Sequence, residues 1–399
     1  MNIILYYLLR RFFVKLRLER DFIILEKGLI IRRRAVVPLS CVTRAEIRRG
    51  LLLRLLCGKK ITIETLSGRI DFYLRKNEEL PFLPKNRGHI IRPERSSVFF
   101  GAFTDTRALS GVILFSLTIY RIGKIFGGSY TDRIIAAISN TAEELTHTLE
   151  LLHIAVPRAA ALGAVFVLTA WGFAFLIKLM GMADFRVSSR AGFVTVRRGL
   201  ITLYEYVVVL NNLDAVISCN TVSSLAAKKA PLYARGTMIF PPVGKELSRR
   251  LISSLCGLPR ENSPEIKPPA RALFGHCALP LGWTAGFAAA LVLTEIALRF
   301  GLIPSAELLQ VVLWYGLAAS LWAVLAYGLY WKFSGMREGE NLLVISARKG
   351  NRLYGGYIPK RASVLESVSQ NPFQRRSGLC DRTVTLYGKR KFRLRNITR

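Results

Sequence analysis

The sequence predicts a mixed membrane protein in which three small antiparallel β-domains alternate with about four apolar helices of membrane-spanning length. Three observations support this prediction. A proline-led motif occurs twice in full and once in weaker form along the 399 residues. Uncharged segments long enough to span a bilayer separate its copies. The segments that hold the motif are strongly basic, and the whole chain has a formal net charge of +32.

The motif opens with a proline and closes with an arginine and a glycine. The three residues are Pro38, Arg54 and Gly58 in the first copy and Pro359, Arg375 and Gly378 in the last. The middle copy, 209–220, lacks the proline, and Leu225 replaces the arginine. Repetition of this kind indicates repeated small domains. We interpret the arginine as structural, donating hydrogen bonds to carbonyls of the turn that follows.

Strand patterns surround each copy. Residues 22–33 are typical of a strand, a glycine turn and a second strand, and residues 60–66 alternate apolar with polar side chains. The last copy ends similarly, with alternation at 382–387 and 391–395. Short strands of period two predict a small antiparallel sandwich or barrel. In the second copy, leucines spaced along one face of 243–255 predict a helix that closes the domain.

Four segments are predicted to cross the membrane, namely 108–126, 158–180, 278–300 and 306–331. A hydrocarbon core about 30 Å thick needs about 20 mostly apolar residues. The first segment is the weakest of the four, because Arg121 and Lys124 interrupt it. We still predict a span there, since long basic side chains near a helix end can reach the interface.

The remaining boundaries follow from these spans. Residues 1–18 are predicted to form an interfacial amphipathic helix, because the apolar stretch before Arg10 is too short to span. The β-domains then cover 19–86, 183–258 and 338–399.

Charge predicts the orientation. Residues 10–107 hold 23 basic and 10 acidic side chains, whereas 127–157 holds one basic and four acidic. The positive-inside rule therefore places all three β-domains in the cytoplasm, with 127–157 as an extracytoplasmic amphipathic loop, in a multi-pass protein of the plasma membrane.

A family resemblance emerges from these residues. The Arg-Arg-Gly-Leu run at 197–200, the proline-led strand, and the arginine and glycine before an alternating strand together resemble the bacterial pleckstrin-homology-like (PH-like) domain bPH2. Three such domains separated by helix pairs look like the long multi-domain membrane proteins of that family. The resemblance implies PH-like folds and a role in envelope homeostasis or stress resistance. It also implies a partner, either a smaller membrane protein with one bPH2-type domain or a second copy of this chain.

One cluster could suggest a metal. Two Glu-x-x-His spacings occur between Glu143 and His153, and such pairs face di-iron centres in helix bundles. Those centres also need carboxylates from neighbouring helices, which no other apolar segment here supplies. We expect instead the polar face of an amphipathic helix, with Leu145 and Leu149 on its apolar side, and no metal.

No catalytic residue or cofactor is predicted. The six cysteines contain no C-x-x-C pair, and the sequence has no phosphate-binding loop, dinucleotide fingerprint or hydrolase motif. The positive charge is divided among three membrane-tethered blocks, so we expect no nucleic-acid partner. We therefore expect a protein that is not an enzyme.

Basic clusters are the candidate contacts for anionic phospholipid headgroups. They comprise Arg32, Arg33, Arg34, Arg48, Arg49, Arg197, Arg198, Lys389, Arg390 and Lys391. The favoured function is a non-catalytic scaffold whose strand edges and basic faces bind proteins and lipid. The alternative is a lipid-handling or transport protein in which the helices form a pathway. It is less favoured because Glu295 and Arg299 lie near a helix end, while the span centres carry no charge.

Overall fold

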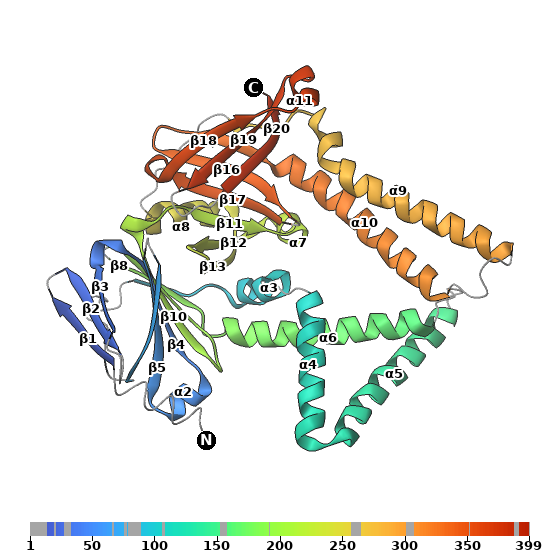
Figure 1. Cartoon of the computed structure of the whole chain (residues 1–399), viewed down its shortest axis with the longest axis horizontal. Coiled ribbons are helices and arrows are strands. Elements are labelled where there is room, and N and C mark those ends of the chain that lie inside the picture. The colour runs from blue at the N-terminus through green and yellow to red at the C-terminus, as the bar shows by residue number, and fades with distance from the viewer. Residues whose placement is uncertain are drawn as a thin grey trace. The chain divides into compact units, whose positions relative to one another are not determined.

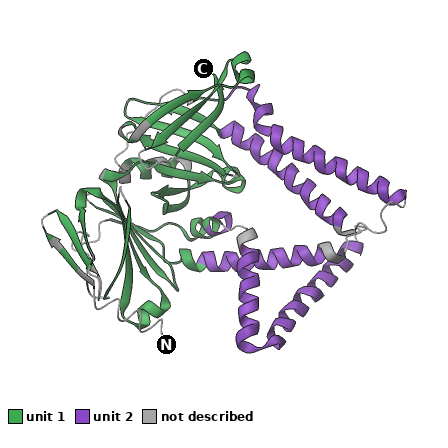
Figure 2. Cartoon of the chain, viewed as in Figure 1, with its two compact units in different colours: residues 1–101, 180–267, 334–399 green, residues 102–179, 268–333 purple. Residues whose placement is uncertain are grey.

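The structure is a computed structural model that describes two compact units (Figure 2). Unit 1 comprises Met1–Gly101, Met180–Lys267 and Ser334–Arg399, and unit 2 comprises Ala102–Leu179 and Pro268–Phe333. The residues described are 14–19, 21–27, 33–65, 68–75, 78, 89–105, 108–151, 158–190, 192–256, 265–300, 307–350, 352–386 and 391–398.

Unit 1 contains one series of elements three times (Figure 1). Repeat 1 has β1 (Val14–Glu19), β2 (Phe22–Lys27), β3 (Arg33–Pro38), η1 (Leu39–Cys41), β4 (Val42–Arg49), α2 (Leu51–Leu55), β5 (Gly58–Thr65) and β6 (Arg69–Arg75). Repeat 2 has β7 (His89–Ile91), β8 (Arg186–Arg190), β9 (Phe193–Arg198), β10 (Leu203–Val209), η2 (Leu210–Asn212), β11 (Val216–Asn220), α7 (Val222–Ala226), β12 (Lys229–Ala234), β13 (Thr237–Gly244) and α8 (Lys245–Cys256). Repeat 3 has β14 (Glu265–Ile266), β15 (Gly335–Glu338), β16 (Leu342–Lys349), β17 (Arg352–Pro359), η3 (Lys360–Ala362), β18 (Ser363–Ser369), α11 (Pro372–Arg376), β19 (Leu379–Leu386) and β20 (Lys391–Thr398).

Most predicted strands are present where the sequence alternates. Residues 60–65 of the first pattern fall in β5, and residues 382–386 and 391–395 of the other two fall in β19 and β20, while residues 66 and 387 lie outside the described part. The helix predicted at 243–255 is α8. Antiparallel sheets, as expected, make up the whole β part.

The start of the chain differs from the prediction. Residues 1–13 lie outside the described part, but Val14–Glu19, which we expected to end an interfacial helix, forms β1. Apolar Val14, Leu16 and Leu18 alternate with charged neighbours, and Leu16 packs against the core of repeat 1. A period of two places such residues on one face of a strand, and this alternation outweighs the helix expected from charge alone.

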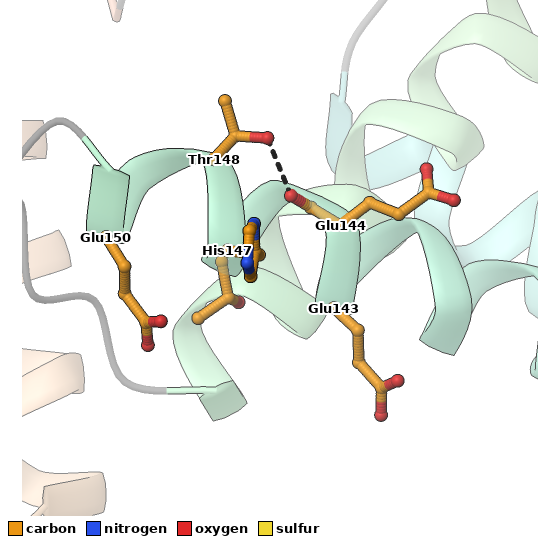
Figure 3. Close-up of a pocket in the computed structure, with 6 residues that line it drawn as sticks. Glu143, Glu144, His147, Thr148 and Glu150 are labelled. Atoms are coloured by element: carbon orange, nitrogen blue, oxygen red, sulfur yellow. Dashed lines mark hydrogen bonds between the residues drawn. The ribbon is translucent and has the colours of Figure 1, made fainter.

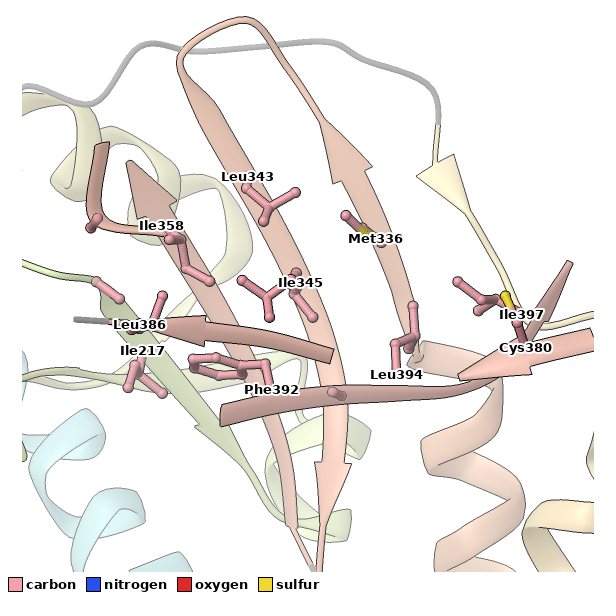
Figure 4. Close-up of a cluster of buried hydrophobic side chains, with 14 residues drawn as sticks. Ile217, Met336, Leu343, Ile345, Ile358, Cys380, Leu386, Phe392, Leu394 and Ile397 are labelled. Atoms are coloured by element: carbon pink, nitrogen blue, oxygen red, sulfur yellow. The ribbon is translucent and has the colours of Figure 1, made fainter. Parts of the chain in front are cut away.

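Each end of unit 1 has its own hydrophobic core. In repeat 1, the largest fully buried side chains are Phe72, Ile23, Leu25, Ile61 and Ile63. The core of repeat 3 includes Phe392 and also Ile217, which comes from β11 of repeat 2 (Figure 4). Neighbouring repeats therefore share core residues.

Unit 2 is helical. It contains the C-terminal end of α3 (Arg95–Asp105), α4 (Ala108–Phe126), α5 (Gly128–Leu151), most of α6 (Arg158–Met182), α9 (Ala272–Arg299) and α10 (Glu307–Phe333). Among the described residues, three stretches are long and apolar enough to cross a membrane: Ala161–Met182, Ala272–Arg299 and Leu309–Phe333. The fourth predicted span forms α4 with the bounds expected, but it is not among these three, so its crossing stays a prediction.

Close helix packing in unit 2 uses small residues. A Cβ added to Gly316 of α10 would lie 2.4 Å from the ring of Phe287 in α9, and Thr284 Oγ1 donates a hydrogen bond to Ser320 Oγ at 3.1 Å. Small residues and buried hydroxyl pairs are typical of helix contacts inside membranes. The predicted pair of Glu295 and Arg299 is present at 3.4 Å and exposed.

Candidate functional site

The repeats are joined by strand pairing. Two seven-stranded sheets each run through two repeats, in the orders β6-β5-β4-β10-β9-β8-β7 and β13-β12-β11-β17-β16-β15-β14. Strand β4 of repeat 1 pairs with β10 of repeat 2, which we call junction 1. Strand β11 of repeat 2 pairs with β17 of repeat 3, which we call junction 2. Backbone hydrogen bonds therefore hold the three repeats together.

Both junctions use the same register. In junction 1, Ala45 lies opposite Val207, and in junction 2, Val216 lies opposite Tyr357. Ala45 and Val216 are each six residues before the short helix of their repeat, and Val207 and Tyr357 are each three before the 3₁₀ helix of theirs. The strand after the 3₁₀ helix of one repeat thus always pairs with the strand before the 3₁₀ helix of the next.

Junction 1 is lined by arginine and tyrosine. Tyr204 and Tyr206 of β10 stack with ring centroids 5.9 Å apart. The guanidinium of Arg44 lies 5.0 Å from the Tyr206 ring centre, and that of Arg48 lies 5.5 Å from the Tyr204 ring centre. Arg198 of β9 lies over Tyr206 from the other side of β10. Such cation–π contacts across three strands favour this pairing of repeats 1 and 2.

Hydrogen bonds also cross junction 1. The amide of Asn212, the last residue of η2, donates to the carbonyls of Ser40 at 2.7 Å and Val42 at 2.8 Å. Arg44 donates to the carbonyl of Arg235 at 3.1 Å. These bonds connect the 3₁₀ helix and a turn of repeat 2 to the start of β4.

Junction 2 is held by close backbone approach instead. Ser218 Oγ donates to the carbonyl of Gly355 at 3.3 Å. A Cβ added to Gly355 would lie 2.4 Å from Ser218 Oγ. A Cβ on Gly356 would lie 3.1 Å from the ring of Phe392. Two consecutive glycines thus let β11 and the core of repeat 3 approach β17.

The polar face of the junction 1 sheet has one strongly shifted group, Asp71 on β6. Burial raises the pKa of this carboxyl, but hydrogen bonds from Thr62, Arg69 and Lys60 outweigh burial and lower the pKa to about 2. Burial also raises the pKa of the Tyr206 phenol, so this ring stays neutral beside its arginines.

The motif residues occupy matching places. Pro38 and Pro359 end β3 and β17, directly before the 3₁₀ helices. Two residues after each short helix the backbone is left-handed, with φ of 48° at Cys57, 53° at Lys228 and 62° at Gly378. Gly378 therefore suits its position, whereas Gly58 lies one residue later, where a Cβ would make ordinary contacts.

Arg54 finds a different acceptor from the one expected. Its Nη2 donates at 3.0 Å to the carbonyl of Leu200 in repeat 2, not to the turn after its own helix. The sequence could not show this acceptor, because it lies 146 residues away. Arg375 holds the matching place in α11, and the structure shows no side-chain hydrogen bond from it to the described residues.

The candidate lipid contacts are separated by the fold. Strand β10 separates two arginine pairs. Arg48 and Arg49 lie in β4 on one side of it, and Arg197 and Arg198 lie in β9 on the other. Arg33 and Arg34 lie in β3, and Lys391 begins β20 with an exposed side chain. Residues 32, 389 and 390 lie outside the described part. Arg48 and Arg198 stack on tyrosines, which gives them a structural contact in addition to any lipid.

An exposed apolar patch adjoins Arg54. It consists of Leu51, Leu52, Leu55, Leu200 and Ile201, which are between 48% and 73% exposed. The backbone N–H of Leu200 donates to the carbonyl of Met180, in the last turn of α6. Met180 belongs to unit 1, so this hydrogen bond joins the patch to a residue of its own unit.

The described part of the Glu-x-x-His segment, residues 143–151, forms the C-terminal end of α5. A shallow pocket there is lined by Glu143, Glu144, Thr146, His147, Thr148 and Glu150. Glu144 points to a different side from Glu143 and Glu150, and Thr148 Oγ1 donates to the backbone carbonyl of Glu144 at 2.8 Å (Figure 3). Within the described residues, which do not include His153, no three metal-binding side chains converge.

Several site residues were missed from the sequence. The tyrosines 204 and 206 have the period-two spacing of a strand face, which was the available signal. The run Leu51-Leu52-Leu53 between arginines signalled an exposed apolar turn. Nothing in the sequence marked Asn212 or Gly355, because their partners belong to other repeats.

Comparison with protein families gives one match. The sequence model of the bacterial PH domain family matches residues 2–94, which include all of repeat 1. This match agrees with the resemblance drawn from the motif and is consistent with a protein that contains a bPH2 domain. Comparisons with curated proteins and with solved structures found no match.

Proposed function

We propose that this protein is a non-catalytic integral membrane scaffold whose three PH-like repeats form one cytoplasmic body that binds partner proteins. The observation that carries the proposal is the strand pairing between repeats. Repeats 2 and 3 share the element order of repeat 1, the part that matches the bacterial PH domain. Strand edges are common protein-recognition surfaces, because an added strand gains main-chain hydrogen bonds.

The pairing also supports the topology. Repeats joined through one sheet lie on one side of the membrane, so the helices between them cross an even number of times. If α6 spans, a second crossing between repeats 1 and 2 is needed, and α4 is the most apolar remaining helix there. The excess of basic residues in the repeats favours the cytoplasmic side.

Peripheral lipid contact is supported by the exposed apolar patch formed by Leu51, Leu52, Leu55, Leu200 and Ile201. Exposed leucines flanked by Arg49 and Arg54 combine apolar burial with attraction to anionic headgroups. An environment-sensitive dye on Leu52→Cys should be quenched by quencher-labelled lipid. The same dye on Arg69→Cys, in β6, is the control.

Reporter fusions test the topology. Fusions after Lys85, Pro259 and Arg399 should behave as cytoplasmic, and a fusion at Thr141 should lie outside. A cytoplasmic reporter at Thr141 would refute the four-span topology.

Reconstitution separates the scaffold from the alternative. In proteoliposomes the whole chain should move neither lipids between leaflets nor small solutes faster than protein-free vesicles do. Faster movement would favour the lipid-handling or transport function. The scaffold itself predicts specific partners on affinity capture from membranes, and loss of those partners when the β18 edge is changed by Leu365→Lys and Val368→Lys.

A further inference from the structure

We infer that β18 of one chain pairs with β3 of a second copy, so that chains join head to tail along the membrane. The inference rests on the proposed function, because it extends the same edge pairing beyond a single chain. In the described part of the chain, β4 is paired with β10 and β11 with β17. The two matching strands that remain, β18 and β3, are edge strands of their three-stranded sheets.

The junctions predict the register of this third pairing. Glu366 is six residues before α11, and Val36 is three before η1, so these two should lie opposite each other. Pro38 does not prevent the pairing. Pro359 holds the same place in β17, and β17 still pairs with β11 through residues 353–357.

The side chains of the two edges suit this register. Leu365 and Val368 are each 58% exposed in β18, and Val36 is 52% exposed in β3. In the predicted register Leu365 faces Val37, which belongs to the core of repeat 1. Glu366 lies diagonally across from Arg34, which pairs opposite charges.

The β18 edge also lacks the usual protection of a free edge. Proteins commonly place lysine, proline or a bulge on exposed edges to prevent strand addition. The sequence of β18, Ser-Val-Leu-Glu-Ser-Val-Ser, contains no basic residue and no proline. Its one register shift lies between Ser363 and Leu365, before the stretch that would pair.

A sequence correspondence points the same way. Junction 1 has an arginine in the short helix, Arg54, and a Gly-Leu pair as acceptor, at Leu200. Junction 2 has neither, since Leu225 replaces the arginine and Gly350 stands at the acceptor position. The arginine and the Gly-Leu pair reappear in the repeats that carry the two unpaired edges. Arg375 is in repeat 3, and the sequence Gly28-Leu29, which lies outside the described residues, precedes β3 of repeat 1.

The β18 edge of one copy would bind the β3 edge of the next, so each added copy leaves a free edge to which a further copy can bind. Such pairing gives a ring when the rotation between copies closes and a filament when it does not. Because every chain would be anchored in the membrane, the repeats of a ring or of a filament would all lie on one face of the bilayer.

Disulfide trapping in the full-length protein tests the inference. Two differently tagged copies are co-expressed in membranes, one with Val36→Cys and one with Glu366→Cys, with Cys41, Cys57 and Cys256 replaced by serine. Directly opposed strand residues have Cα atoms about 4.5–5.5 Å apart, within disulfide reach. We expect a product of two chains that carries both tags. Combining Val36→Cys with Ser369→Cys shifts the pair by three residues, about 10 Å, and should give none.

Three results would overturn the inference. The first is no two-chain product while the junction 1 control, Ala45→Cys with Val207→Cys, forms its disulfide within one chain. The second is equal yield from the shifted pair, and the third is a disulfide between positions 36 and 366 only within single chains when both are placed in one copy. If one of these three results were obtained while capture of partner proteins still depended on Leu365 and Val368, the proposed scaffold function would stand and only the pairing between copies would be refuted.

Discussion

Junctions 1 and 2 hold the same strand pairing with different chemistry. Junction 1 uses arginine–tyrosine stacking and an asparagine that caps two carbonyls of the neighbouring repeat. Junction 2 uses paired glycines, a serine hydroxyl and an isoleucine that enters the next core. The register is common to both, so the backbone pattern is what the repeats share. Side chains decide how each junction responds to substitution.

The largest effect is expected in junction 2 from Gly355→Val. The added side chain would overlap Ser218 Oγ and force β11 away from β17. Such overpacking should lower the free energy of unfolding by about 1–3 kcal/mol. The melting temperature of the full chain in detergent should fall. Glu205→Val, at the matching place in junction 1, is the control and should have little effect, because a larger side chain already occupies that site. Equal melting curves for the two variants would show that close approach is not what holds junction 2.

Asn212→Ala should weaken junction 1 selectively. It removes two hydrogen bonds to backbone carbonyls, a loss of about 1 kcal/mol or more. Repeat 3 has Ala362 at this place and needs no such bond. Thiol labelling gives the measurement. A cysteine introduced by Val207→Cys should react faster in the variant, while buried Cys219 of junction 2 should not. Faster labelling of both cysteines would mean that the junctions open together.

A smaller, pH-dependent effect is expected on the junction 1 sheet from Asp71→Asn. The folded-state pKa of Asp71 is lowered to about 2 from the ordinary aspartate value of 3.8, so its ionised form stabilises the fold above about pH 4. That contribution is lost as the pH falls towards 2. The melting temperature of the wild type should exceed that of the variant at pH 7, and most of the difference should be lost by pH 2. A constant difference across this range would exclude ionisation as its cause.

The shared strands also limit what single repeats can show. An isolated third repeat would lose β11, which supplies Ile217 to its core and covers the β17 edge. Stability effects of Arg375→Ala are therefore best measured in the whole chain. Arg54, the counterpart of Arg375, bridges two repeats at an exposed site. We therefore expect Arg375→Ala to weaken the assembly of chains more than it lowers the stability of the folded chain.

The sequence alone determined the repeats, most strands, the helix α8 and the apolar helices, because these depend on local periodicity and on long uncharged runs. The motif also indicated a turn after Arg54 and Arg375, but not the short helix that holds each arginine or the left-handed residue that follows it. The sequence did not determine that Val14–Glu19 is a strand, since short charged segments fit either helix or strand until a core is present to bury one face.

Only the tertiary structure decided which edges pair and in which register. Main-chain hydrogen bonds are the same for every residue except proline, so a strand sequence does not specify its neighbour, and a period of two is compatible with several registers. The acceptor of Arg54, the carbonyls bound by Asn212 and the glycines of β17 all depend on contacts between residues more than 130 positions apart. Packing between repeats fixes those contacts, and local sequence cannot.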